Sequence, residues 1–65
     1  MVGDKIKQQR ENQNLSLRKL AAKSNVSPSY LYYIETGISK NPSINVMQKI
    51  ANALGVEVTT LIDTA

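Results

Sequence analysis

The residues from Leu17 to Glu35, LRKLAAKSNVSPSYLYYIE, carry the clearest helical pattern in the chain. Their apolar side chains recur at helical spacing in two short runs separated by a polar break. Asn25 lies in that break and is a residue type that adopts left-handed backbone at little cost, so the chain can turn sharply there. Ser27 and Pro28 suit the start of the second run, because serine is a favoured N-cap and proline is tolerated at the first helical position. We therefore predict two short helices joined by a tight turn.

The outward face of the second helix differs from an ordinary solvated surface. If Leu31 and Ile34 point inward, Ser29 and Tyr33 point almost directly away, with Tyr32 on one flank. These side chains are hydroxylated or aromatic and none is acidic, whereas solvated faces usually mix charges. Two short helices joined by a tight turn form a helix-turn-helix, whose second helix commonly enters the DNA major groove. The pattern favours DNA binding, although an exposed tyrosine pair also suits a protein interface.

Composition excludes several classes of function. The 65 residues suffice for one domain with a small core. The chain contains no cysteine and no histidine, which removes thiol chemistry, the usual general base and the commonest metal ligands. The five carboxylates are scattered and no glycine-rich phosphate loop is present, so we expect no enzyme, no cofactor and no metal site. No signal peptide or apolar run of membrane length appears, which predicts a cytoplasmic protein without a membrane partner.

The net charge of +3 is unevenly distributed. Between residues 5 and 23, six lysines and arginines accompany a single glutamate. Basic surface attracts phosphate through a long-range, salt-sensitive term that requires no sequence readout. The helix pair therefore lies in the half of the chain best suited to nucleic acid, with a solvated Lys/Arg surface as the alternative.

The remaining sequence supplies three further helices. Asp4 is predicted to cap the first helix and Asn14 to end it in a left-handed conformation. After a polar connector, Ser43 caps a fourth helix that Gly55 closes. The alternating run 56–60 is also typical of a strand, but no partner of similar type exists. We predict an all-α, compact five-helix bundle in one domain over residues 1–65, with helices at about 4–12, 17–23, 28–35, 44–54 and 58–63.

Further motifs complete a known pattern. Thr36-Gly37 follows the helix pair, NPSI occupies residues 41–44, and IANALGV occupies residues 50–56. With the opening VGDKIKQQRENQNLSL (residues 2–17), these motifs make the chain resemble the Cro/C1-type (XRE family) helix-turn-helix domain, and especially the DNA-binding half of SinR-type repressors. The resemblance covers about residues 2 to 63. It implies a lambda-repressor-like fold of five helices whose third helix lies in the major groove.

The resemblance also implies which residues contact DNA. It places base contacts on Ser27, Pro28, Ser29, Tyr32 and Tyr33. It places phosphate contacts at the start of the second helix and along the connector, on Ser16, Leu17, Arg18, Lys40, Asn41 and Ser43. The free amides and positive dipole end of a helix start suit a phosphate oxygen. For Lys40 the alternative is a plain solvated charge.

The resemblance implies an ion pair between Arg10 and Glu35 that aims the third helix, the alternative being two independent solvated charges. The sequence departs from its relatives at Leu17, where they often carry glutamine, and at Pro28, where many carry a polar or basic reader. No Arg, Lys, Asn or Gln stands at the base-contact positions. Readout is therefore expected from hydroxyl groups, from apolar contact with thymine methyls and from DNA shape.

We expect a transcriptional regulator, of the repressor kind, that binds a double-stranded DNA operator with palindromic or repeated half-sites. Val58, Leu61 and Ile62 are expected to belong to the core, and residual apolar surface around them would allow a homodimer to match such sites. The alternative is a protein-interaction module on the same scaffold, such as an antitoxin or antirepressor, and a protein antagonist is a further expected partner. SinR-type proteins carry a separate C-terminal oligomerisation segment. We find no such segment in these 65 residues, so the oligomeric state stays open.

Overall fold

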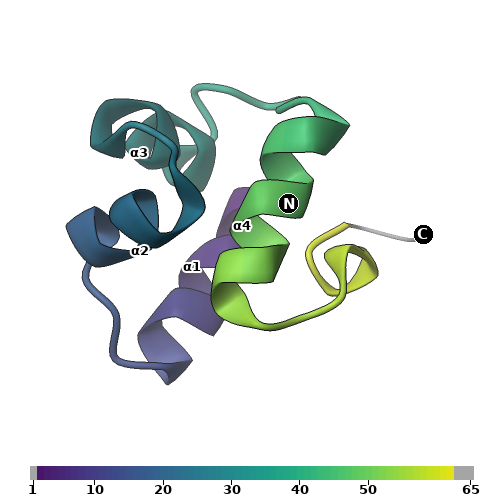
Figure 1. Cartoon of the computed structure of the whole chain (residues 1–65). Coiled ribbons are helices and arrows are strands. Elements are labelled where there is room, and N and C mark those ends of the chain that lie inside the picture. Colours follow the sequence, from purple (N-terminus) through teal and green to yellow (C-terminus); the bar gives the residue numbers. More distant parts are fainter. Residues whose placement is uncertain (1, 63–65) are drawn as a thin grey trace.

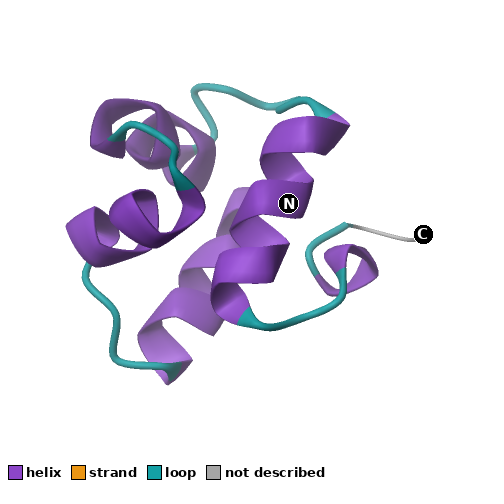
Figure 2. Ribbon diagram, in the orientation of Figure 1, coloured by secondary structure: helices purple, strands orange, loops and turns teal. Residues whose placement is uncertain are grey.

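The computed structural model describes residues 2–62, which form four α-helices and one 3₁₀ turn (Figure 1, Figure 2). They are, in chain order, α1 (Val2–Asn12), α2 (Leu17–Ser24), α3 (Pro28–Thr36), α4 (Ile44–Leu54) and η1 (Val58–Thr60). In Figure 1, α2 and α3 lie to one side of α1 and α4, and η1 lies on the other side of α4. The predicted all-helical fold is confirmed, with α4 at its predicted bounds and α2 and α3 each one residue longer.

The predicted fifth helix at residues 58–63 is wrong. Only Val58–Thr60 are helical, as one 3₁₀ turn that ends at Leu61, and residue 63 lies outside the described residues. Three consecutive β-branched residues weaken helix formation there, because their side chains lose rotamer freedom in a helix. A single turn is also sufficient, since it already buries Leu61 completely. The last three residues of the run 56–60, for which a strand was the alternative, form this turn.

The start of α1 also differs from the prediction. The helix begins at Val2, so Asp4 lies inside its first turn and is not the N-cap. A carboxylate in this turn still interacts favourably with the positive end of the helix dipole. Gly3 lies inside the helix and is buried against the end of α3. An added Cβ at Gly3 would lie 2.8 Å from the Glu35 carbonyl oxygen and closer still to that of Ile34, so the two backbones can approach only because this residue is glycine.

The other helix ends follow the local chemistry of the sequence. The hydroxyl oxygens of Ser16, Ser27 and Ser43 accept hydrogen bonds from backbone amides in the first turns of α2, α3 and α4, at 3.1, 3.1 and 3.2 Å. Left-handed residues end the helices, with φ of 57° at Asn14, 58° at Asn25, 85° at Gly37 and 70° at Gly55. The roles of Ser27, Ser43, Asn14, Asn25 and Gly55 were predicted, and Asn25 and Ser27 fix the tight turn between α2 and α3.

Every helix contributes to one core. Its apolar members are Ile6, Leu20, Ala21, Val26, Leu31, Ile34, Met47, Ile50, Ala51, Leu54 and Leu61. Leu31 and Ile34 point inward from α3, as predicted, while Tyr30 is partly buried against the core. Helix α3 packs against α1 and α2, and α2 also packs against α4. The opposite face of α3 is consequently left uncovered by the fold.

Candidate nucleic-acid interface

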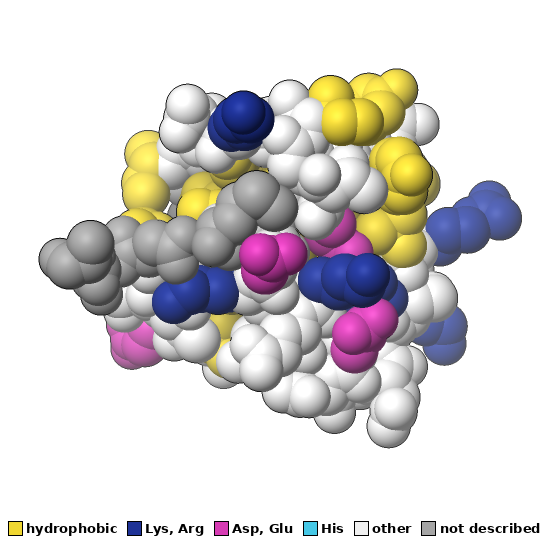
Figure 3. Space-filling model, turned by 180° about the vertical axis from the view of Figure 1, so that it is seen from behind, with side chains coloured by type: hydrophobic (Ala, Val, Ile, Leu, Met, Phe, Trp, Pro, Cys, Tyr) yellow, Lys and Arg dark blue, Asp and Glu magenta, His cyan; other side chains and the backbone are white. Residues whose placement is uncertain are grey.

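The uncovered face of α3 carries the predicted base-contact residues. Tyr32 and Tyr33 are 52% and 45% exposed, and Ser27, Pro28 and Ser29 are exposed beside them. The two tyrosine rings meet edge to face, with centroids 6.2 Å apart. Figure 3 shows hydrophobic side chains gathered at the edge of the molecule that carries α3, with Lys and Arg side chains next to them. All five residues therefore present their side chains to the outside together.

Leu17 joins this group through the packing of α2 on α3. An open hollow between the two helices is lined by Leu17, Pro28, Ser29, Tyr32 and Tyr33. Leu17 was predicted as a phosphate contact from its place at the start of α2. Its apolar side chain lies with the residues of the α3 face instead, and only its backbone amide is suited to a phosphate.

Cationic side chains lie at both ends of this hollow. Pro28 also lines a second hollow, which contains Arg18 and Asn25. Leu17 and Tyr32 also line a third hollow, which contains Lys7 and the paired side chains of Arg10 and Glu35, so Lys7 is, among residues 2–62, its unpaired basic group. The exposed surface thus has an uncharged centre with basic ends, which is the distribution expected where base edges lie between two rows of phosphates. Lys7 is a candidate phosphate contact that the prediction missed, and its position one helical turn before Arg10 was the available signal.

The connector residues form a separate part of the surface. Lys40 and Asn41 are exposed and line a different hollow with Val2, Ile44 and Ile62. Ser43 is exposed, but its hydroxyl oxygen caps α4, as that of Ser16 caps α2. Both hydroxyl groups keep their own hydrogen for donation to an oxygen acceptor. The structure therefore does not bring Lys40, Asn41 and Ser43 into the hollow beside α3.

Arg10 and Glu35 form an ion pair that joins α1 to α3. Arg10 Nε donates to Glu35 Oε2 at 2.8 Å, and Nη2 donates to Oε1 at 3.1 Å. Arg10 Nη1 also donates to the Leu15 carbonyl oxygen at 2.8 Å. The two side chains are only 13% and 5% exposed, so they are not independent solvated charges. The hydrogen bonds to Glu35 outweigh desolvation and raise the pKa of Arg10, so the pair favours the charged guanidinium.

The architecture and this surface agree with one protein family. A family model described as helix-turn-helix matches residues 6–61, which is most of the chain. The chain belongs to the helix-turn-helix family. Its solved relatives include a crystal structure of SinR, described as the master regulator for biofilm formation, in complex with DNA. That structure superposes with a TM-score of 0.93 at 44% identity, covering 97% of this chain and all of that one.

Curated relatives in the family are longer than this chain. The transcriptional regulator SinR of Bacillus subtilis (strain 168) is 44% identical over 63 residues, which are 97% of this chain and 57% of SinR. The immunity repressor of Bacillus phage phi105 is 39% identical over 61 residues, which are 94% of this chain and 42% of that repressor. A structure of a SinR–SinI protein complex also matches, with a TM-score of 0.92, covering 97% of this chain and 61% of that one. The predicted resemblance to SinR-type helix-turn-helix domains is confirmed.

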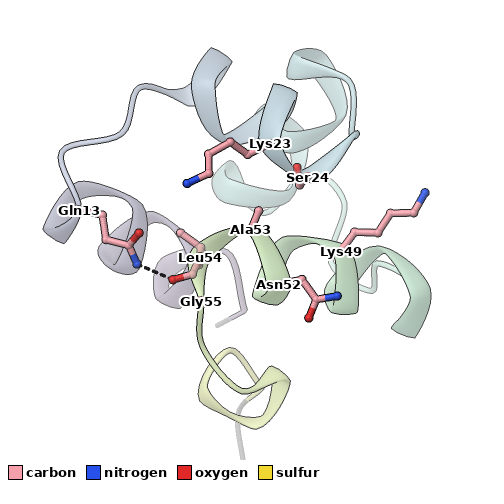
Figure 4. A pocket seen from close by; sticks show the side chains of 8 residues that line it. All are labelled: Gln13, Lys23, Ser24, Lys49, Asn52, Ala53, Leu54 and Gly55. Carbon is pink, nitrogen blue, oxygen red and sulfur yellow. Dashed lines mark hydrogen bonds between the residues drawn. The ribbon is translucent and has the colours of Figure 1, made fainter.

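Another hollow in this family member lies at the ends of α1, α2 and α4 (Figure 4). Lys23 and Lys49 line it, together with Gln13, whose Nε2 donates to the Leu54 carbonyl oxygen at 2.7 Å. This bond satisfies a carbonyl at the end of α4 and was not predicted. Among residues 2–62, no three acidic, histidine or cysteine side chains come together to hold a metal ion. No helix in the same range has the length and hydropathy to cross a membrane.

Proposed function

We propose that this chain is the duplex-DNA-binding domain of a transcriptional regulator, and that α3 enters the major groove. The observation that carries the proposal is the exposed, uncharged face of α3 with basic side chains at both ends of its hollow. The DNA complex of SinR supports it, because SinR has the same fold at 44% identity. The phage phi105 immunity repressor supports a repressor role. Such a regulator works where the DNA is, in the cytoplasm, and requires no catalytic residue or cofactor.

The proposed contacts follow the surface. Bases face Ser27, Pro28, Ser29, Tyr32 and Tyr33, while phosphates meet the start of α2 and the connector, at Ser16, Leu17, Arg18, Lys40, Asn41 and Ser43. Lys7 is added to the phosphate contacts because it shares a hollow with Leu17 and Tyr32. In this scheme the Arg10–Glu35 pair holds the end of α3 and sets its angle to the groove.

The proposal is tested by selecting bound fragments from random duplex DNA and measuring affinity for the selected site at several salt concentrations. We expect affinity to fall steeply with salt, because each phosphate contact releases counterions. Lys40→Ala should weaken binding to all sequences and reduce the salt slope by about one. Lys49→Ala removes the same charge from α4, at the hollow of Figure 4, and serves as the matched control. Affinity that ignores salt would refute the phosphate assignments.

Tyr33→Ala tests the base contacts separately. Because Tyr33 is 45% exposed and absent from the core, the variant should keep its fold and its non-specific affinity. Its preference for the selected site should fall, since each good base contact contributes about 1–3 kcal/mol of discrimination. Circular dichroism provides the folding control. An unchanged ratio of specific to non-specific affinity would show that α3 does not face the bases.

The chain is further proposed to act as a homodimer on palindromic or repeated half-sites. Val2, Ile44, Met47 and Ile62 line an apolar hollow beside Lys40 and Asn41, so a second copy covering it would lie next to the same DNA. Ile44 is 62% exposed, and Ile44→Ser, which adds no charge beside Lys40 and Asn41, should abolish cooperative binding to paired half-sites while leaving affinity for a single half-site. A protein-interaction role remains the second candidate, because the SinR–SinI complex shows a related scaffold with a protein partner. Binding of a partner that persists after nuclease treatment, without any DNA affinity, would favour that candidate.

A further inference from the structure

The hollow between α2 and α3 has a definite chemical preference. Of its five lining residues, Leu17 and Pro28 have no polar side-chain atoms, and Tyr32 and Tyr33 contribute aromatic rings. The hydroxyl groups of Ser29 and the tyrosines are the only side-chain hydrogen-bonding groups in the lining. No guanidinium, ammonium or carboxamide group is present to form two parallel bonds with a base edge. The hollow therefore favours an apolar group over a group that needs two parallel hydrogen bonds.

The walls of the hollow are held in place by both helices. Leu17 is the first residue of α2, behind the Ser16 cap, and Pro28 is the first residue of α3, behind the Ser27 cap. The proline ring fixes φ at its own position. The edge-to-face contact between Tyr32 and Tyr33 restrains both rings on the other side. The hollow is thus formed before any ligand arrives, which lowers the entropic cost of filling it.

The basic residues at its ends limit what can approach. Arg18 lies beyond Pro28 on one side, and Lys7 lies beyond Leu17 and Tyr32 on the other. Duplex DNA fits this arrangement, because its phosphates border a groove in which the base edges are exposed. In the major groove, the C5-methyl group of thymine is the one apolar group that the four ordinary bases present.

We propose that this hollow receives the C5-methyl group of a thymine, and that the methyl group itself selects thymine at that operator position. The inference rests on the proposed function and deepens it by naming the group that is read and the residues that read it. Leu17 and Pro28 contact the methyl group from two helices, and Tyr32 and Tyr33 exclude water around it. Leu17 and Pro28, which stand where related sequences often carry polar residues, then form one apolar reading site.

The test replaces thymine by uracil, one position at a time, in a duplex site selected from random DNA. Uracil lacks only the methyl group and keeps every hydrogen-bonding atom, and the protein is unchanged, so folding cannot confuse the result. At the position facing the hollow we expect affinity to fall about fourfold, the value of one buried methyl group. Replacement at other thymines should leave affinity unchanged.

A protein variant then assigns the effect to this hollow. Leu17→Ala removes one wall, and the variant should bind the thymine and uracil sites with nearly equal affinity. Ile38→Ala shortens an aliphatic side chain that is 68% exposed and absent from the hollow, and this control should retain the fourfold difference. A thymine–uracil difference that persists in folded Leu17→Ala, or that appears at no position, would overturn the inference.

The inference and the proposed function fail in different ways. Salt-dependent binding to the selected site with no thymine–uracil difference would refute the methyl-reading hollow and leave the DNA-binding function intact. Failure to select any DNA would refute the DNA-binding function itself, whereas affinity independent of salt would refute the phosphate contacts.

Discussion

Replacement of Glu35 by glutamine should destabilise the domain severely. The substitution keeps the size of the side chain but removes the negative charge that faces Arg10. Arg10 keeps its hydrogen bond to the Leu15 carbonyl oxygen, but its two hydrogen bonds to residue 35 lose their charged acceptor. Because the two side chains are 5% and 13% exposed, the cost should match that of a broken buried pair, about 3–5 kcal/mol. An exposed pair would cost only about 0–1 kcal/mol.

This cost is large for a chain of 65 residues. Stabilities of roughly 0.05–0.15 kcal/mol per residue correspond to about 3–10 kcal/mol for the whole domain. Glu35→Gln should therefore remove between a third and all of the stability. Since each kcal/mol changes Tm by about 4–8 °C in a domain of this size, we expect Tm to fall by more than about 10 °C.

Urea and thermal unfolding followed by circular dichroism at neutral pH measure the effect. Glu57→Gln makes the same chemical change at an exposed residue whose side chain forms no capping bond, and it should change stability by no more than about 0.5 kcal/mol. The double variant Arg10→Met, Glu35→Met removes both charges and should recover most of the loss. A cost below about 1 kcal/mol for Glu35→Gln would refute the argument that burial makes this ion pair important.

Three further substitutions test other contacts of the fold by the same unfolding measurements. Gly3→Ala should destabilise by about 1–3 kcal/mol because its Cβ meets the carbonyls of α3, although alanine is the better helix former; a gain in stability would contradict that close approach. Asn25→Ala should cost about 1–2 kcal/mol at φ of 58°, whereas Asn25→Gly should be nearly neutral, and equal costs would exclude backbone strain as the cause. Gln13→Ala should cost about 0.5–1.5 kcal/mol through the lost bond to Leu54, and no change would show that water replaces it.

Features that depend on a few neighbouring residues could be predicted from the sequence. The serine caps, the left-handed Asn14 and Asn25, and the bounds of α4 all follow from local backbone and hydrogen-bonding chemistry. The orientation of α3 followed from helical period alone, because Leu31 and Ile34 leave one direction for Ser29 and Tyr33. The η1 segment was misjudged because apolar spacing indicates which residues are buried and does not measure how long a helix must be to bury them.

Features that join distant residues could not be predicted in this way. Gln13 and Leu54 lie 41 residues apart, and no property of either residue indicates the other. The role of Gly3 was not predicted, because the carbonyls that exclude a side chain there belong to α3. The grouping of Leu17 with Pro28 and Tyr32 likewise depends on how α2 crosses α3. From the sequence alone, Leu17 could only be assigned the role that related sequences give to the first residue of α2.

The two ends of α3 are held by different means, and this difference determines how substitutions elsewhere should act on binding. Its start is fixed by the Ser27 cap and by packing on α2, which also forms the hollow. Its end is fixed by α1, through Gly3 and the Arg10–Glu35 pair, and α1 also carries Lys7 beside the same surface. A change at Gly3 or Glu35 should therefore move the end of α3 relative to Lys7 and alter affinity without touching DNA. Helix α1 is then a positioning element of the proposed interface as well as part of the core.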